Sequence, residues 1–569
     1  MITTASFDFD AIVVGSGITG GWAAKELTEK GLSVLVLERG RDLQHGTGYL
    51  GEHAPSWKLP FNGKPQRELE AENYEVQSKV YAFSTANMQF WNNDKLNPYA
   101  SDEGSQFNWF RGGVVGGRSL TWGRQTYRWS EEDFKANAKD GHGIPWPVDY
   151  DEIAPWYSYV EKFIGVNGRK EGLPQLPDGE FQKPMPWYAV EETIAERLKK
   201  SAPDITLTNA RTAILTEDLP GRAACHYCGP CENGCSTGSY FSSQSSTLPA
   251  ARATKKMTLR ANSVVERLEY DPASGAVSKV HVIDSETLER HAFSSRIVFL
   301  CASTVGSTQL LLNSTSEAFP NGLANCSGVL GQNLMDHFLG LGTVGMFADN
   351  LDTYFAGNRP TGLYIPRFRN LPGQTEELDF VRGYGFQTAI SSSNWMGQLN
   401  AKGFGAGLKN SLSQLRNSWT FYAGGFGECL PNPKNRVYLG NKKDRYGMRQ
   451  VAFEFNWGEN EKAMAHDIQA QGKRILEAGG AAFTMSFGDV ENLSIPGSGI
   501  HEMGTARMGD DPAQSVLNKY NQAHDVPNLF VTDGSFMTSS SCVNPSLTYM
   551  AFTARACDYA VKQLQAGAL

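Results

Sequence analysis

The sequence predicts an α/β protein, and three observations support this class. A buried strand, a glycine-rich turn and a helix follow one another at the start of the chain. Near its end, an apolar strand leads into Asp533-Gly534 and a long apolar helix follows. Between them, residues 131–204 and 346–495 lack nucleotide motifs and carry aromatic side chains.

The composition is that of a large globular protein. The 569 residues include 52 basic and 60 acidic side chains, a formal net charge of −8, which gives no electrostatic reason to expect nucleic acid or an anionic membrane as a partner. At roughly 150 residues per domain, the length suggests three or four domains. The 59 glycines exceed ordinary usage, so we expect many close approaches of the backbone to itself or to a ligand.

The N-terminus carries no recognisable sorting signal. Met1–Asp10 includes two aspartates and no basic residue, and no apolar run approaches the ~18 residues of a membrane span. We therefore expect synthesis in the cytoplasm without a signal of the chain's own, and no direct membrane span.

The first motif has the pattern G-x-G-x-x-G. Ala11–Val14 reads as a buried strand, and Gly15-Ser16-Gly17-Ile18-Thr19-Gly20 follows it. Gly15 would allow the tight turn, Gly17 the approach of a pyrophosphate, and Gly20 the packing of helix on strand. The helix N-terminus would supply N–H donors to the phosphates. The alternative is a structural glycine turn.

A second strand supports the nucleotide interpretation. Ser33–Leu37 is apolar and ends at Glu38, which lies 23 residues after Gly15. An acid at this place accepts a hydrogen bond from a ribose 2′-hydroxyl. The combination predicts a Rossmann-like dinucleotide site.

Two further segments favour a flavin nucleotide over a nicotinamide one. Arg111–Gly123 is a glycine-dense loop whose backbone could lie against a flat ring. Asn544-Pro545 is predicted to open a helix running to about Gln563, with Asn at the N-cap and Pro at N1. The dipole of that helix would favour an anionic group, such as a reduced flavin carbonyl, at its N-terminus.

Together these motifs resemble the glucose–methanol–choline (GMC) flavin oxidoreductases over most of the chain. The matching blocks are the N-terminal motif with Glu38-Arg39-Gly40, the loop Gly112–Gly123, Ile297–Leu312, Gly328–His337, and the C-terminal stretch from His501 to Pro545. The resemblance implies a Rossmann-like FAD domain built from residues 1–130, 205–345 and 496–569. It also implies an inserted α+β substrate domain, residues 131–204 and 346–495, built on an antiparallel sheet as in p-hydroxybenzoate hydroxylase-like folds.

The resemblance also assigns FAD contacts by position. It places the pyrophosphate on Gly15–Gly20, the ribose on Glu38, adenine against Val265, and the ring system near Gly116–Trp122. The full set of implied FAD-binding residues is Gly15, Gly17, Gly20, Glu38, Arg39, Arg111, Gly116, Gly117, Ser119, Thr121, Trp122, Val265, Ala302, Asp533, Gly534 and Asn544. Pyranose oxidases carry a histidine in this loop that bonds covalently to FAD. Thr121 stands in the corresponding stretch here, so we expect non-covalent FAD.

A histidine and an asparagine are the candidate catalytic pair. Oxidising an alcohol by hydride transfer requires a base for the hydroxyl proton, and a histidine with a pKa near ~6.5 suits that task. His501 lies in His-Glu-Met-Gly-Thr-Ala, and Asn544 follows 43 residues later. By resemblance to the pyranose-oxidising branch, His501 is the general base and Asn544 orients the hydroxyl. Either residue could instead be structural, Asn544 as a helix cap. His337 is expected to be a packing residue rather than a second base.

Four of the nine cysteines form one cluster. Cys225, Cys228, Cys231 and Cys235 have the spacing C-x2-C-x2-C-x3-C of a bacterial ferredoxin, which favours an iron–sulfur cluster held by four or by three thiolates, [4Fe–4S] or [3Fe–4S]. Zinc, free thiols and disulfides are the alternatives. The segment resembles glucoside 3-dehydrogenase catalytic subunits and membrane-linked sugar dehydrogenases. The other five cysteines are expected in the core.

The favoured function is an FAD- and iron–sulfur-dependent dehydrogenase that oxidises a pyranose or glucoside hydroxyl, at C3 by resemblance. The alternatives are an oxygen-reducing pyranose or glycoside oxidase with structural cysteines and a non-catalytic electron carrier, against which the His501/Asn544 pair argues. The resemblance further implies a small partner subunit whose twin-arginine signal exports the folded complex to the periplasm, and a cytochrome c-type electron acceptor.

The sequence of the expected substrate domain contains general patterns but no specific motif. Val451, Phe453, Phe455 and Trp457 alternate like a strand with one apolar face, consistent with a sheet beneath the flavin. Aromatic side chains could stack on sugars, although core packing is the commoner role; they include Trp395, Trp419, Phe421, Tyr422 and Phe426. The Trp-, Pro- and Tyr-rich stretch 131–190 is expected to form a loop over the active site or an interface.

Overall fold

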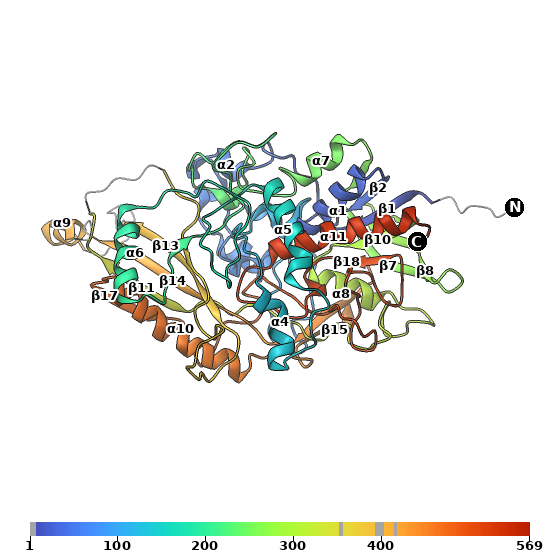
Figure 1. Cartoon of the computed structure of the whole chain (residues 1–569). Coiled ribbons are helices and arrows are strands. Elements are labelled where there is room, and N and C mark those ends of the chain that lie inside the picture. The colour runs from blue at the N-terminus through green and yellow to red at the C-terminus, as the bar shows by residue number, and fades with distance from the viewer. Residues whose placement is uncertain (1–6, 352–356, 393–402, 415–417) are drawn as a thin grey trace.

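The computed structural model describes residues 7–351, 357–392, 403–414 and 418–569. Figure 1 shows a body with a parallel sheet and both termini at one end, and an antiparallel sheet with long flanking helices at the other. This arrangement confirms the predicted fold class, a Rossmann-like domain with an α+β domain on an antiparallel sheet.

The parallel sheet has the order β18-β10-β1-β2-β6. Its strands are β1 (Phe9–Val14), β2 (Val34–Leu37), β6 (Met257–Arg260), β10 (Ser295–Leu300) and β18 (Leu529–Val531). Each neighbouring pair is parallel, so the carboxyl ends of all five strands meet at one edge. The strands β1, β2 and β10 are almost wholly buried aliphatic runs, as parallel strands covered on both faces require.

Helices cover the parallel sheet. They are α1 (Ile18–Glu29), α7 (Thr247–Ala253), α8 (Thr304–Asn313) and α11 (Ser546–Gln565). Helix α1 packs against both α7 and α11. A three-stranded antiparallel sheet of β7 (Ser263–Asp271), β8 (Ala276–Asp284) and β9 (Arg290–Phe293) lies beside α8. This scaffold holds the strand ends in fixed positions around the site described below.

The second sheet is antiparallel, with the order β17-β11-β14-β13-β12-β5. Its strands are β5 (Thr208–Asn209), β11 (Gly342–Phe347), β12 (Leu363–Ile365), β13 (Tyr384–Ser392), β14 (Trp419–Gly427) and β17 (Phe483–Phe487). Helix α10 (Glu459–Ala478) packs on β11, β14 and β17, and its partner is α6 (Ala189–Ser201). A separate core of buried residues fills the space between this sheet and these helices.

The remaining elements are short or peripheral. The helices are α2 (Leu50–His53), α3 (Arg67–Asn73), α4 (Glu131–Asp140), α5 (Tyr150–Ile164) and α9 (Gly405–Gln414); the strands are β3 (Val166–Asn167), β4 (Phe181–Gln182), β15 (Arg436–Lys443) and β16 (Arg449–Glu454). The 3-10 turns are η1 (Ser56–Lys58), η2 (Pro60–Gly63), η3 (Gln77–Lys79), η4 (Met88–Phe90), η5 (Gly117–Leu120), η6 (Cys231–Asn233) and η9 (Gly534–Phe536). Among the described residues, no helix has both the length and the apolar content needed to cross a bilayer.

Three local expectations need correction. The alternating segment is a strand only in part, because β16 ends at Glu454 and leaves Phe455 and Trp457 outside it. Strand β16 pairs with β15 in a two-stranded sheet, and Phe453 stacks on Phe107 at 4.2 Å between ring centroids. Helix α11 begins at Ser546 with Pro545 at the N-cap, so Asn544 does not cap it. The 131–190 stretch contains α4, α5 and the start of α6 rather than one loop, and α5 packs against α11.

Candidate active site

The predicted nucleotide and catalytic residues line one cavity of about 400 Å³. It lies where β1, β2, β10 and β18 end, and it extends to β13 and to the start of α11. Ligands of open α/β sheets bind in this position because loops at the carboxyl ends of the strands surround an open crevice. Of the predicted site residues outside the cysteine cluster, all but Gly20 and Gly116 line the cavity.

The glycine turn between β1 and α1 is built on close backbone contacts. A Cβ on Gly15 would lie 2.4 Å from the Cys301 carbonyl oxygen, and a Cβ on Gly20 would lie 1.9 Å from the Gly15 carbonyl oxygen. Gly17, in contrast, has no atom within 4 Å of its missing Cβ and lines the cavity. Gly17 is also the N-cap of α1 and supplies no side chain to the first N–H groups, which leaves them available to an anionic ligand.

Glu38 lines the cavity directly after the end of β2. Its carboxylate accepts hydrogen bonds from Ser16 N (3.0 Å), Ser16 Oγ (2.6 Å) and Gly40 N (2.7 Å). Burial raises the pKa of this carboxyl, and these hydrogen bonds oppose the shift. Ser16 Oγ in turn accepts a hydrogen bond from Gly116 N at 2.9 Å, so the first glycine turn and the second glycine loop are tied together.

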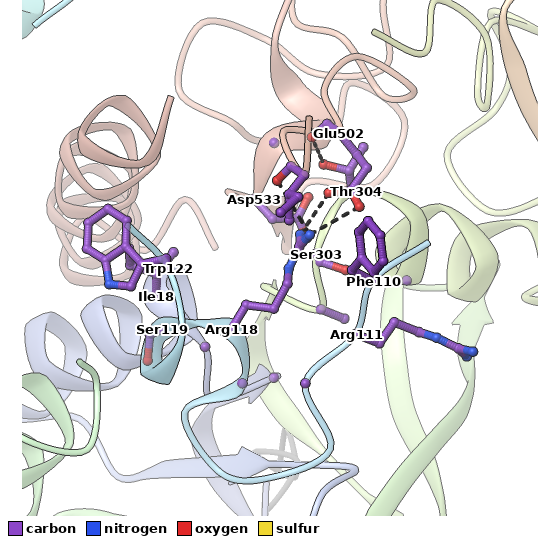
Figure 2. Close-up of a pocket in the computed structure, with 18 of the residues that line it drawn as sticks. Ile18, Phe110, Arg111, Arg118, Ser119, Trp122, Ser303, Thr304, Glu502 and Asp533 are labelled. Carbon is purple, nitrogen blue, oxygen red and sulfur yellow. Dashed lines mark hydrogen bonds and ion pairs between the residues drawn. The ribbon is translucent and has the colours of Figure 1, made fainter. Parts of the chain in front are cut away.

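Arg118 and Glu502 form an ion pair across the cavity wall. Arg118 donates to both Glu502 carboxylate oxygens, at 3.1 and 2.8 Å, and the Glu502 side chain is buried. Figure 2 shows Arg118 reaching from the glycine loop toward Glu502, with Trp122 and Arg111 on either side of it in that view. The pair joins the loop to the segment that carries His501.

Asp533 anchors the C-terminal strand end. Its carboxylate accepts hydrogen bonds from Ser307 Oγ and from the backbone N–H (3.1 Å) and hydroxyl (2.6 Å) of Ser535. Burial raises the pKa of this carboxyl. Asp533, which lines the cavity, therefore connects the end of β18 with α8.

His501 and Asn544 face each other, with Asn544 Nδ2 3.4 Å from His501 Nε2. The backbone N–H of His501 donates to Asp336 Oδ1 at 3.0 Å, which fixes the segment. Burial lowers the pKa of His501 well below its ordinary value, and His337 and Arg118 lower it further. A neutral imidazole in this position can accept a proton.

Two groups behind this pair were not assigned to the site from sequence. His337 is fully buried, and its Nδ1 lies 3.1 Å from His501 Nδ1, while its Nε2 lies 2.8 Å from the Ser541 carbonyl oxygen. Gln387, on β13, donates from Nε2 to Asn544 Oδ1 at 2.7 Å. His337 was visible in the Met-Asp-His motif, whereas no local signal marks Gln387, because only the sheet register brings it to the site.

The four clustered cysteines line a second, smaller cavity. Cys225, Cys228, Cys231 and Cys235 surround a space of about 20 Å³ together with Glu52. The loop turns inward through left-handed residues at Tyr227, Gly229 and Gly234. Within residues 7–351, 357–392, 403–414 and 418–569, however, no three His, Cys, Asp or Glu side chains are arranged to hold a metal ion.

The other cysteines and the aromatic side chains follow the expectations in part. All nine cysteines, each in the described part of the chain, are unpaired. Cys301, Cys429, Cys542 and Cys557 are buried as predicted, but Cys326 is exposed. Phe426 lines the main cavity, Trp419 and Phe421 are buried in the core of the antiparallel sheet, and Tyr422 is exposed. Trp395 lies outside the described residues.

Comparisons with known proteins agree with this geometry. Family models described as GMC oxidoreductase match residues 9–339 and 431–553. The chain is 29% identical to 2-methyl-1,2-propanediol dehydrogenase of Mycolicibacterium austroafricanum, over 98% of this chain and 96% of that protein. It is 26% identical to the fructose dehydrogenase large subunit of Gluconobacter japonicus, over 98% of both. The crystal structure of pyridoxine 4-oxidase from Mesorbium loti shares the fold, with a TM-score of 0.59, 16% identity, and coverage of 97% of this chain and 99% of that one.

Proposed function

The chain belongs to the GMC oxidoreductase family, whose members are flavin enzymes acting on CH–OH groups of alcohols or sugars, and from this we propose that it is a sugar dehydrogenase. We propose a pyranose or glucoside as substrate and its C3 secondary hydroxyl as the reacting group. The observation that carries the proposal is the His501/Asn544 pair, whose facing nitrogens lie 3.4 Å apart at the wall of the cavity.

The proposed reaction uses both members of the pair. The hydroxyl proton of the substrate passes to His501 Nε2, while Asn544 Nδ2 donates a hydrogen bond to the same oxygen. As the O–H bond breaks, the carbon–oxygen bond becomes a carbonyl and the carbon loses its hydrogen as a hydride. FAD, when bound, supplies the acceptor for that hydride at N5. The protonated His501 and the Asn544 amide then hold the carbonyl oxygen of the keto-sugar.

The residues around the cavity fit FAD. Gly17 leaves open space where any other residue would place a Cβ, at a helix N-terminus with free N–H groups, as a pyrophosphate requires. Glu38 lies at the end of β2, where a ribose hydroxyl could reach its carboxylate. We assign the contacts to the FAD-binding residues predicted above. Thr121 in the second glycine loop leaves FAD bound non-covalently.

We further propose an iron–sulfur cluster on Cys225, Cys228, Cys231 and Cys235. The support for this proposal is the C-x2-C-x2-C-x3-C spacing and the four free thiols that line one cavity. As described, these thiols are not arranged to hold a metal ion and enclose only about 20 Å³, so a cluster would require the loop to rearrange around it. Its role would be to pass the two electrons of each hydride singly to an external acceptor.

The partner and compartment form the remaining part of the proposal. One relative, at 26% identity and full-length coverage, is named as the large subunit of fructose dehydrogenase. We propose that this chain likewise acts with a small subunit carrying a twin-arginine signal, that the complex works in the periplasm, and that a cytochrome c-type protein takes the electrons. We also propose that the two interleaved domains divide at residues 130, 204, 345 and 495.

The function is tested by product identification. The purified enzyme is incubated with D-glucose, methyl α-D-glucoside, D-fructose and 2-methyl-1,2-propanediol, each with an artificial electron acceptor or with oxygen alone. We expect turnover of a pyranose with the artificial acceptor and an NMR spectrum of a 3-keto product. If only the diol is oxidised, the substrates are simple alcohols rather than sugars. Rapid peroxide formation without an added acceptor would instead establish the oxidase alternative.

The cluster has its own test, by metal analysis. We expect iron and acid-labile sulfide in stoichiometric amounts in the wild-type protein, and their loss with retained flavin in Cys231→Ser. Cys326→Ser is the matched control, because Cys326 is an exposed cysteine outside the loop. Absence of iron from aerobically and anaerobically purified protein would contradict the proposal.

A further inference from the structure

To act on a hydroxyl group, the His501/Asn544 pair must present one hydrogen-bond acceptor and one hydrogen-bond donor. A neutral imidazole carries its hydrogen on one ring nitrogen only, and the other nitrogen is the acceptor. If His501 carried its hydrogen on Nε2, that atom could not take the substrate proton. The structure contains a chain of hydrogen bonds that decides which nitrogen of His501 is protonated.

This chain of hydrogen bonds begins at the Ser541 carbonyl oxygen, which can only accept a hydrogen bond. It lies 2.8 Å from His337 Nε2, so the hydrogen of His337 is on Nε2. His337 is fully buried, and burial lowers its pKa to about 4, so its Nδ1 carries a lone pair. His501 Nδ1, 3.1 Å from that lone pair, must then be the donor. His501 Nε2 is left unprotonated, on the side of Asn544.

The Ser541 carbonyl group is itself held in place by neighbouring residues. Ser541 has a left-handed backbone, with φ of 56°, and its hydroxyl donates to Asp133 Oδ1 at 2.9 Å. The other oxygen of Asp133 accepts from the backbone N–H and the hydroxyl of Ser130, both at 2.7 Å, at the start of α4. All three residues are buried, so the orientation of the carbonyl is built into the packing of α4 against this loop.

Asn544 is oriented from the opposite side. Its Oδ1 accepts from Gln387 Nε2 at 2.7 Å, which leaves Nδ2 toward His501 Nε2. A donor and an acceptor therefore stand 3.4 Å apart at the cavity wall. A hydroxyl in the cavity, within hydrogen-bond distance of both nitrogens, can donate to His501 and accept from Asn544. If either side chain were turned the other way, it would oppose the reaction.

We propose that His337 and Gln387 are positioning residues that fix the donor and acceptor polarity of the His501/Asn544 pair. The inference rests on the proposed function, because it assumes that this pair meets the substrate hydroxyl. It gives His337 a defined task beyond packing, and it makes the sheet that carries Gln387 part of the catalytic geometry.

The first test replaces His337 in the FAD-loaded enzyme. His337→Leu keeps the bulk but removes the acceptor, whereas His337→Asn can place its Oδ1 near the position of Nδ1 and accept from His501. We expect at least a 10-fold lower rate of anaerobic flavin reduction by substrate in His337→Leu and substantial recovery in His337→Asn, at equal FAD content and thermal stability. Equal rates in His337→Leu and the wild type would overturn the proposal.

A direct readout of the proton position accompanies the kinetics. With 15N-histidine labelling, NMR of the wild-type holoenzyme should show His501 protonated on Nδ1 only, and His337→Leu should show a mixture of both forms. His501→Ala assigns the signal. The titratable groups next to His501 are His337, Arg118 and Asp336, and Glu502 pairs with Arg118. Burial raises the pKa of Asp336 to about 7, so all spectra are recorded at the same pH, well above that value. A His501 protonated on Nε2 in the wild type would overturn the proposal.

The second test uses Gln387. The carboxylate of Gln387→Glu cannot donate a hydrogen bond at neutral pH, so the Asn544 amide should turn and present Oδ1 to His501. Gln387→Met removes the hydrogen bond to Asn544 Oδ1 without favouring the turned orientation. We expect the Glu variant to reduce flavin more slowly than the Met variant, with both below the wild type. Wild-type rates in both variants would overturn the role of Gln387. If no sugar or alcohol reduces the wild-type flavin, the proposed function fails, while the NMR experiment still decides the proton position.

Discussion

At the scale of single residues, the site depends on groups that are kept neutral by burial. His501 lies in a desolvated position beside the cationic Arg118, and both influences lower its pKa. His337 has a pKa of about 4 for the same main reason. A histidine with a lowered pKa remains a base as the pH falls, which sets an expected pH profile for the enzyme.

In Asp336→Asn, which removes a carboxyl whose pKa burial raises to about 7, we expect flavin reduction to be independent of pH from about 8 down to 6.5, the ordinary histidine pKa, and to fall only in more acid solution. Because the pKa of His501 is lowered, its imidazole is unprotonated at every pH above that lowered value and can accept a proton there. Anaerobic stopped-flow measurements across this range check the prediction. A loss of rate that is centred at pH 7 or above would contradict it.

Replacement of His501 by Ala should lower the rate of flavin reduction by about 10²- to 10⁴-fold, the usual contribution of a general base. FAD content should not change. His466→Ala is the matched control, because His466 is exposed and pairs only with Glu491 at the surface. Full turnover in His501→Ala would remove this residue from the chemistry.

At the scale of secondary structure elements, the β1–α1 turn was predictable because its chemistry is local. Strand, turn glycines, helix and second strand occur where the pattern placed them, and the contacts of Gly15 and Gly20 explain why no side chain fits there. A strand with alternating apolar residues from Val451 to Trp457 was also predicted, but β16 ends at Glu454 and its partner was not predicted. Register and partner depend on contacts between distant segments, which periodicity does not contain.

The glycine turn gives a test at this scale. Gly17→Ala should fold normally, since nothing lies within 4 Å of the added Cβ, but the methyl group enters the cavity and should weaken FAD binding by at least 10-fold. Gly407→Ala, at an exposed position in α9, should bind FAD normally and gain up to ~1 kcal/mol of helix stability. FAD affinity measured by fluorescence during reconstitution distinguishes the two. Unchanged affinity in Gly17→Ala would contradict the pyrophosphate assignment.

At the scale of the whole molecule, a buried arginine connects the antiparallel sheet with α4. Arg382, just before β13, donates to Glu428 at 2.8 Å, to Asn137 at 2.9 Å and to Asp140 at 3.0 Å. Glu428 is 1% exposed, and burial raises its pKa despite the nearby arginine. Because α4 also carries Asp133, this contact lies next to the hydrogen bonds that lead to His501.

Arg382→Met should therefore cost about 3–5 kcal/mol of stability, because it leaves the buried Glu428 carboxylate without its cation. Arg436→Met is the control: its ion pair with Glu454 is exposed on both sides, and such pairs contribute about 0–1 kcal/mol. We expect a clear fall in Tm for the first variant and almost none for the second. Equal Tm values would show that the contact between α4 and the sheet contributes little.

The sequence by itself determined the fold class, the family and the glycine turn, and it marked His501 and Asn544 as the candidate pair, because short-range patterns carry those features. Only the tertiary structure decided how the pair is oriented. Gln387, Asp336 and Ser541 reach the site from β13 and from two loops, and each contacts a residue at least 157 positions away in the chain. Such contacts depend on how separate elements pack, so the polarity of the catalytic pair is a property of the folded molecule.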